Sequence, residues 1–106
     1  MRLDIFQPAT GTGTGGTGSV TGSSARVTPT FIAGQTAPMN ILITNVGTDT
    51  LMVEFGDITV TASATTSCTI LPNDKQLFNW NPGQSFAVIG VTGSGSSYYW
   101  KLGYGA

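Results

Sequence analysis

Histidine is absent from the sequence, which removes the side chain that most often serves as a general base near neutral pH. Ser-His-Asp and Cys-His catalysis are therefore excluded, as are the histidine ligands that most zinc sites use. Asp49, Glu54 and Asp57 could in principle bind calcium, but they lack the spacing of a dedicated ligand loop, and we interpret them as solvated turn residues. We predict that the protein is not an enzyme and holds no cofactor and no metal.

Cysteine occurs once, as Cys68. A single thiol cannot form a disulfide within the chain, so the fold must depend on packing. Cys68 lies in a short alternating segment with no imidazole to activate its thiol. This context predicts a buried, unreactive side chain.

Charge is also scarce, since only 8% of the residues are charged, against roughly 25% in an ordinary soluble domain. The four basic residues, Arg2, Arg26, Lys75 and Lys101, are scattered along the chain. Without a basic cluster, we predict no binding to nucleic acid and no docking on anionic membranes. A weakly charged surface gives little repulsion between molecules, which favours association with a partner or with other copies of the chain.

No apolar run approaches the 18 residues of a membrane-spanning helix, and no basic segment followed by an apolar one begins the sequence. We therefore expect a protein made in the cytoplasm and not exported by a signal peptide.

Glycine, threonine and serine dominate residues 8–24, where Val20 is the one sizeable apolar residue. Such a segment buries too little surface to offset the entropy of ordering it, so it is predicted to be a flexible tether. Gly13, Gly15 and Gly18 match G-x-G-x-x-G, but no strand and helix flank them, and we interpret them as part of the tether. Leu3, Ile5 and Phe6 would form an apolar tip. We thus divide the chain into an arm, residues 1–24, and a domain, residues 25–106.

Within the domain, apolar residues alternate with a period of two, which is typical of strands. Ile41 and Ile43 share one face, as do Leu51, Val53 and Phe55. Residues 81–84 (NPGQ) fit a type II turn, and the apolar run 85–91 fits a strand buried on both faces. About eight short strands are expected, over residues 27–32, 39–45, 50–56, 57–63, 67–71, 75–80, 85–91 and 98–104. The fold class is therefore all-β, a small β-sandwich or jelly-roll-like domain of antiparallel strands.

Aromatic residues gather near the end of the chain. Alternation places Tyr98, Trp100 and Tyr104 on one face of the last strand and Tyr99 on the other. The first face could fill the core, but tyrosine and tryptophan also anchor protein interfaces and stack on sugars. Our candidate interface set combines both parts of the chain and comprises Leu3, Ile5, Phe6, Tyr99, Trp100 and Tyr104.

Several segments resemble the small virion proteins of tailed bacteriophages, in particular capsid decoration (cement) proteins. They are residues 40–48 (NILITNVGT), 53–57 (VEFGD), 70–74 (ILPND), 81–85 (NPGQS) and 98–106 (YYWKLGYGA). The resemblance implies a β-sandwich or jelly-roll-like domain, often trimeric, that sits on a capsid lattice. It also implies a terminal arm that extends over neighbouring subunits, and it assigns no binding residues.

The function expected from these observations is decoration and stabilisation of a phage capsid by bridging major capsid protein subunits. The partners would be the major capsid protein and copies of the chain itself, as a homotrimer, and the location would be the virion surface. Two alternatives stay open. One is another virion role, in a tail, baseplate or head fibre, and the other is a carbohydrate-binding module that uses Trp80 or Trp100.

Overall fold

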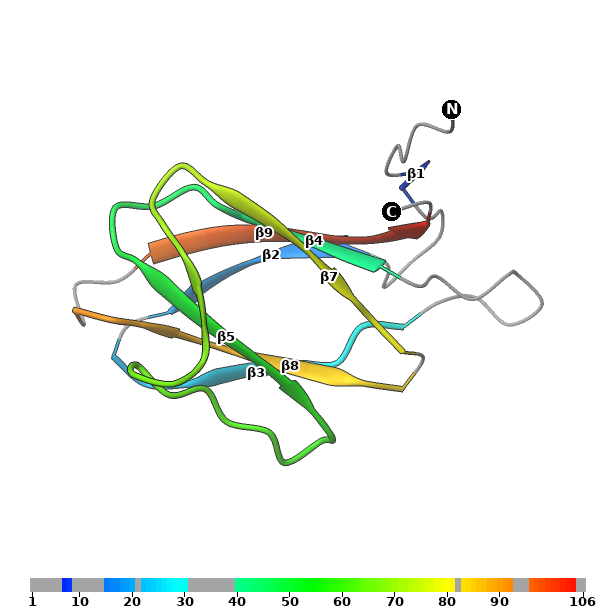
Figure 1. Ribbon diagram of the computed structural model, residues 1–106, viewed down its shortest axis with the longest axis horizontal. Coiled ribbons are helices and arrows are strands. Elements are labelled where there is room, and N and C mark those ends of the chain that lie inside the picture. The colour runs from blue at the N-terminus through cyan, green and yellow to red at the C-terminus, as the bar shows by residue number, and fades with distance from the viewer. Residues whose placement is uncertain are drawn as a thin grey trace.

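The fold is a sandwich of two antiparallel sheets, seen in a computed structural model that describes residues 7–8, 15–20, 22–30, 40–81, 83–92 and 96–104 (Figure 1). The described part of the chain contains strands and no helix. The strands are β1 (Gln7–Pro8), β2 (Gly15–Val20), β3 (Ala25–Val27), β4 (Asn40–Asn45), β5 (Leu51–Gly56), β6 (Cys68–Ile70), β7 (Lys75–Asn79), β8 (Ser85–Gly90) and β9 (Ser96–Tyr104).

The strand pairing is nested, as in a long hairpin that has been folded over on itself. β2 pairs with β9, β3 with β8, β4 with β7, and β5 with β6. Further pairing of β9 with β4 and of β8 with β5 gives one sheet ordered β1-β9-β4-β7, with β2 also on β9, and a second ordered β3-β8-β5-β6. This is the arrangement of a jelly roll, so the predicted all-β sandwich is confirmed.

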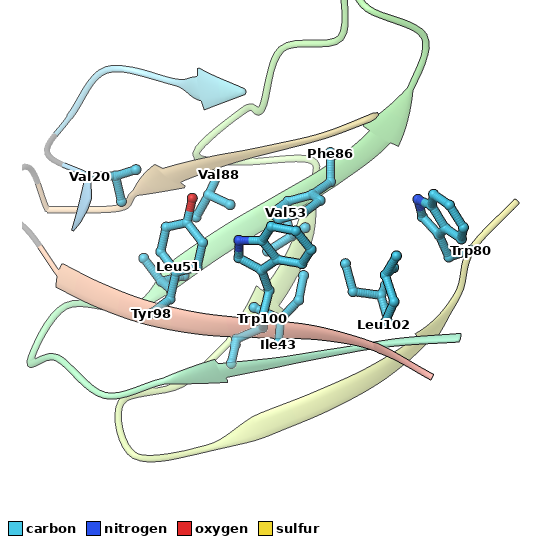
Figure 2. Packing of buried hydrophobic residues seen from close by; sticks show 12 residues of the cluster. Val20, Ile43, Leu51, Val53, Trp80, Phe86, Val88, Tyr98, Trp100 and Leu102 are labelled. Atoms are coloured by element: carbon cyan, nitrogen blue, oxygen red, sulfur yellow. The ribbon is translucent and has the colours of Figure 1, made fainter. Parts of the chain in front are cut away.

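The core lies between the two sheets and is built by the alternating faces that the sequence predicts. Ile41, Ile43, Leu51 and Val53 are fully buried, and Phe55 packs against them. Figure 2 shows the side chains of β9 pointing toward those of β5 and β8. The Phe86 ring meets Trp100 edge-on, with centroids 5.7 Å apart, and such contacts stabilise a fold by about 0.5–1.5 kcal/mol beyond the area they bury.

Strand β2 differs from the sequence prediction, which places residues 15–20 in a flexible tether. Its glycines lie opposite the largest side chains of β9, with Gly16 facing Trp100 and Gly18 facing Tyr98. A Cβ atom at Gly18 would lie 2.5 Å from the Tyr98 ring, and one at Gly16 would lie 3.2 Å from the Trp100 indole nitrogen. Glycine is required at position 18, because the Tyr98 ring occupies the space that a side chain would need, and the fit against Trp100 at Gly16 is tight.

Residues 57–63 also depart from the prediction, because they form a loop instead of a strand. The Asp57 carboxylate accepts hydrogen bonds from the backbone N–H (2.8 Å) and the hydroxyl of Thr59, and the N–H of Val60 donates to the Asp57 carbonyl at 3.1 Å. This local turn competes successfully with the strand that the alternating Ile58 and Val60 suggest. Ile58 is 68% exposed as a result.

This β5–β6 loop, residues 57–67, covers the outer face of the β3-β8-β5-β6 sheet. Arg26 on β3 donates from Nε to the Val60 carbonyl at 2.9 Å, and the Ser67 hydroxyl donates to Glu54 on β5 at 3.0 Å. Ala87 on β8, which lies between these two residues in the register, is completely buried. The loop therefore explains why residues 85–88 are buried on both faces, as predicted, whereas Ile89 is partly exposed and Val91, beyond the end of β8, is 40% exposed, contrary to the prediction for 85–91.

Two local predictions have opposite outcomes. The type II turn at 81–84 is confirmed, since the N–H of Gln84 donates to the Asn81 carbonyl at 2.9 Å and Gly83 has a φ of 88°. The prediction that Cys68 is buried is wrong, because this thiol is exposed. Cys68 lies opposite Val53 in the register, but β6 is an edge strand and nothing flanks it on its outer side in the described sheet.

We predict that Gly18→Val destabilises the fold by about 1–3 kcal/mol, because the added side chain must displace the Tyr98 ring. For a domain of this size the melting temperature, measured by circular dichroism, should fall by several degrees. The matched control is Thr17→Val on the same strand, whose side chain is exposed. Equal melting temperatures for the two variants would contradict the packing of β2 described above.

We predict that Thr59→Val raises the pKa of Asp57. Hydrogen bonds from the Thr59 side chain and backbone, with a smaller contribution from the charge of Arg26, hold the pKa of this carboxyl below its ordinary value of 3.8. A lowered pKa stabilises the fold above the unfolded-state pKa, and this contribution is lost as the pH falls through the folded-state pKa. Carboxyl carbon chemical shifts followed by NMR from pH 2 to 6 should show the change. Thr61→Val, at another exposed position, should leave the Asp57 titration unaltered.

Candidate functional site

The candidate interface residues separate into three groups. Leu3, Ile5 and Phe6 lie outside the described residues. Trp100 points into the core, with 9% of its surface exposed, and Tyr104 is partly buried against the same core. Tyr99 alone of the candidates on β9 faces outward, with 53% of its surface exposed.

Neither tryptophan is available to a ligand in this fold. Trp80 is 1% exposed, and its indole N–H donates to the Gln84 carbonyl at 3.0 Å. Trp100 lies among Phe86, Tyr98 and Leu102 between the sheets (Figure 2). Stacking on a sugar needs an exposed ring, so the two residues named for a carbohydrate site do not provide one.

The outward side chains of β9, β4 and β7 form a continuous surface, which we call the β9–β4–β7 face. The register aligns Tyr99 with Thr44 and Lys75 in one row, and Lys101 with Leu42 and Leu77 in the next. Side chains directly opposite each other on neighbouring strands lie about 4.5–5.5 Å apart at their Cβ atoms. The face therefore brings Tyr99, Leu42 and Leu77 together, and Lys75 and Lys101 lie in the same two rows.

This face is open, whereas the outer face of the other sheet lies under the β5–β6 loop. Tyr99 is 53% exposed, Leu77 is 38% exposed, and Lys75 is also exposed. The jelly roll, whose two sheets are seen in Figure 1, thus has one outer face covered by the loop, around β3, β5 and β8. On the other outer face, Tyr99 and Leu77 are exposed. The alternating pattern of the sequence predicts that Tyr99 and Lys101 share a face of β9. It does not predict that Leu42 and Leu77 lie beside them, because that depends on the pairing of β9 with β4 and of β4 with β7.

Charge is also unequally divided between the two outer faces. Glu54, Asp57 and Arg26 belong to the covered side, while Lys75 and Lys101 belong to the β9–β4–β7 face. Asp74 lies at the end of this face, in the β6–β7 turn, where its carboxylate accepts the N–H of Lys75 at 2.8 Å. Among the described outward residues of β2, β9, β4 and β7 there is no acid.

A buried polar cluster closes one end of the sandwich. The Asn45 amide donates to the carbonyls of Asp49 at 2.7 Å and Ile70 at 3.1 Å, and its oxygen accepts from the Gly47 N–H at 3.0 Å and the Ser96 hydroxyl at 2.8 Å. Every polar atom of the Asn45 side chain is therefore paired, which makes this cluster a structural tie between β4, β6 and β9.

Asp49 corrects the interpretation of the acids as solvated turn residues, because only 2% of its surface is exposed. Its carboxylate accepts the Thr92 N–H at 3.2 and 3.3 Å, so it holds the β8–β9 connection against the β4–β5 hairpin. Within the described ranges, no three His, Cys, Asp or Glu side chains are grouped so that they could hold a metal ion. The described chain likewise contains no helix of the length and hydropathy needed to cross a membrane.

We predict that Asn45→Ala destabilises the fold by roughly 3 kcal/mol, because it leaves several buried donors and acceptors without partners. Urea unfolding followed by tryptophan fluorescence gives the free energy. Asn79→Ala is the control, since this exposed side chain makes one long hydrogen bond of 3.4 Å to Asn40. A loss for Asn45→Ala no greater than for the control would show that the cluster is not a structural tie.

Comparisons with known proteins identify the fold and no family. No family model matches the sequence, and the search of curated proteins found no match. Among solved structures, the crystal structure of PirA is 11% identical, matches 88% of this chain and 96% of its own, and superposes with a TM-score of 0.56. The Drosophila NLP core, a structure concerned with pentamer formation and histone binding, is 10% identical over 84% of this chain and 96% of its own, with a TM-score of 0.39. The similarity to PirA shows a shared architecture alone.

Proposed function

We propose that the chain is a non-enzymatic structural protein of a phage virion, which decorates the capsid and stabilises it by bridging major capsid protein subunits. The observation that carries the proposal is the open β9–β4–β7 face, where exposed Tyr99 and Leu77 lie on a well-packed jelly roll. The resemblance to capsid decoration proteins supplies the virion context.

The segments that carry the resemblance build the scaffold of the sandwich. Residues 40–48 form β4 and the turn that contains Gly47, and residues 81–85 form the turn before β8. Residues 98–104 lie in β9, which supplies both Tyr99 on the open face and Trp100 in the core. The resemblance thus covers two of the three strands of the open face, β4 and β9, and not β7.

A single face of this size is a weak binding site, because association costs translational and rotational freedom that a few side chains scarcely offset. On a lattice the same weak contact is repeated at every position. If copies of the chain join, as the resemblance implies for a trimer, each contact raises the effective concentration of the next. Bridging of neighbouring capsid subunits follows from such repeated contacts.

Images of intact particles from the phage that encodes the chain test this proposal directly. We expect density for the jelly roll on the capsid surface, between major capsid subunits. Shells that lack the protein should open at a lower temperature than decorated shells when they are heated. Density confined to the tail, baseplate or head fibre would contradict capsid decoration, as would equal opening temperatures.

A test of whether the N-terminal segment contributes to capsid attachment must delete less than the whole predicted arm, residues 1–24. Removing residues 1–24 would also remove β2, which contacts Tyr98 and Trp100, so unfolding would obscure any effect on attachment. Deleting residues 1–6 removes Leu3, Ile5 and Phe6 and stops before β1. We expect this deletion to keep the melting temperature and to lower capsid occupancy. Unchanged occupancy would show that the segment is not an anchor.

A further inference from the structure

Strand β7 lies at the edge of the sheet that contains β9 and β4, and among the described residues no strand lies on its outer side. We infer that β7 pairs antiparallel with β7 of a second copy of the chain, about a two-fold axis at Leu77. This inference goes beyond the proposed function, because it concerns how two copies join and applies to the purified protein. The direction of the free backbone groups of β7, its charges and the exposure of its side chains favour this partner.

The backbone of β7 presents free hydrogen-bonding groups at alternate residues. In an antiparallel ladder, hydrogen-bonded residue pairs alternate with pairs that are not hydrogen-bonded. The N–H of Asn45 donates to the Asp74 carbonyl at 2.8 Å, so these two residues form a hydrogen-bonded pair that continues the β4–β7 ladder. Counted in steps of two from Asp74, the even-numbered residues of β7 face β4. The odd-numbered residues direct their N–H and carbonyl groups away from the sheet, and these are Lys75, Leu77 and Asn79.

A second β7 carries the same free groups in an order that matches them. With a two-fold axis at Leu77, each leucine lies opposite its copy, and Lys75 lies opposite Asn79 of the second copy. Outward residues then meet outward residues along the whole strand, so their N–H and carbonyl groups find partners. A shift by one residue would place outward residues opposite inward ones and lose these hydrogen bonds, so the pairing has a defined register.

The side chains of the two strands are compatible in this register. Lys75 is the one charged residue of β7, and it meets an asparagine instead of the same lysine. Leu77 is 38% exposed, and its contact with Leu77 of the second copy removes apolar surface from water. On the inner side, the exposed Gln76 covers the partly buried Phe78 of the second copy, whose ring centroid lies 5.1 Å from that of Phe55 in its own molecule.

The other free edges of the described sandwich suit a second copy less well. β3 and β6 have three residues each, so a pair of either strand would form few hydrogen bonds. β2 is longer, but its glycines supply few side chains to set a register. Apart from Lys75 at its start, β7 lacks the devices that usually protect an edge strand, since it contains no proline and its pairing with β4 has no bulge.

A pair of this kind doubles the open face. The two-fold axis runs perpendicular to the sheet, so the β9–β4–β7 faces of the two copies lie side by side on one surface, with an exposed Tyr99 in each. Two linked contacts raise the effective concentration of each other. A two-fold contact closes on two copies, so the trimer that the resemblance implies would have to use another surface.

An exchange of charge at the axis tests the pairing. Sedimentation of the purified chain should show a dimer that dissociates on dilution. Leu77→Lys places two ammonium groups opposite each other and Leu77→Glu two carboxylates, so each variant alone should have a dissociation constant raised about tenfold or more. An equimolar mixture of the two variants should form dimers again, because opposite charges then meet at the axis. The matched control is Ile58→Lys, which adds the same charge at an exposed site on the covered side and should dimerise normally.

Proline substitutions test the direction of the backbone groups. Proline lacks an N–H, and edge strands accept it where the N–H would face away from the sheet. Leu77→Pro should therefore prevent dimers while it changes the melting temperature little. Gln76→Pro should lower the melting temperature by several degrees, because the N–H of this residue faces β4.

Three results would overturn the pairing. The first is a chain that sediments as a monomer at every concentration, and the second is an oligomer that the Leu77 substitutions do not affect. The third is a mixture of the Leu77→Lys and Leu77→Glu proteins that stays monomeric although both keep the melting temperature of the unsubstituted chain. None of these results bears on capsid decoration, which is tested on intact particles, so the two proposals fail separately.

Discussion

Strand β9 is paired on both sides, with β2 and with β4, and its inward side chains fill much of the space between the sheets. The rings of Tyr98 and Trp100 occupy the room opposite the glycines of β2, and they meet Phe86 from the other sheet edge-on. The large rings of β9 and the glycines that face them on β2 therefore fit together. The closure of the sandwich depends on this fit, because the chain has no disulfide and its two sheets are joined through packing.

The buried polar cluster supplements this packing at one end of the molecule. Asn45, Asp49 and Ser96 are all buried, and together they connect the β4–β5 hairpin to β6, β9 and the Thr92 backbone. A buried amide with all its partners in place specifies one arrangement of these loops, because any other arrangement would leave polar groups unsatisfied. The apolar centre and the polar end therefore have different roles, one in stability and one in selecting a single structure.

The sequence predicts the parts of this fold that depend on nearby residues. Alternation identifies the inward faces of β4, β5 and β9, and Asn-Pro-Gly-Gln predicts its turn, since each signal is contained in a few consecutive residues. The role of β2 is not predictable in the same way. Its glycines are explained by Tyr98 and Trp100, some 80 residues later in the chain, and without that pairing a Gly/Thr segment has the composition of a tether. Val20, buried at the end of β2, is the one local sign.

Other differences arise where local chemistry or position in the sheet overrides the pattern. The Asp57–Thr59 turn interrupts the alternation of Ile58 and Val60, and the edge position of β6 exposes Cys68 although its register partner Val53 is buried. The candidate interface mixed both faces of β9. The structure distinguishes these faces, because Trp100 is buried in the core and Tyr99 is exposed. The residues that surround Tyr99 on the surface are known only from the pairing of β4 with β9 and with β7.

The same strand links the core to the open face, and this has a consequence for the proposed attachment to the capsid. Tyr99 lies between Tyr98 and Trp100, whose rings are fixed by packing, in a strand that is paired with β2 on one side and with β4 on the other. The backbone of Tyr99 is therefore already ordered before a partner arrives. Binding then costs chiefly the side-chain freedom of Tyr99 and Leu77, which is the condition under which a small surface contributes usefully to affinity. Because β9 serves both purposes, substitutions in the core that loosen this strand should weaken attachment even though they contact no partner.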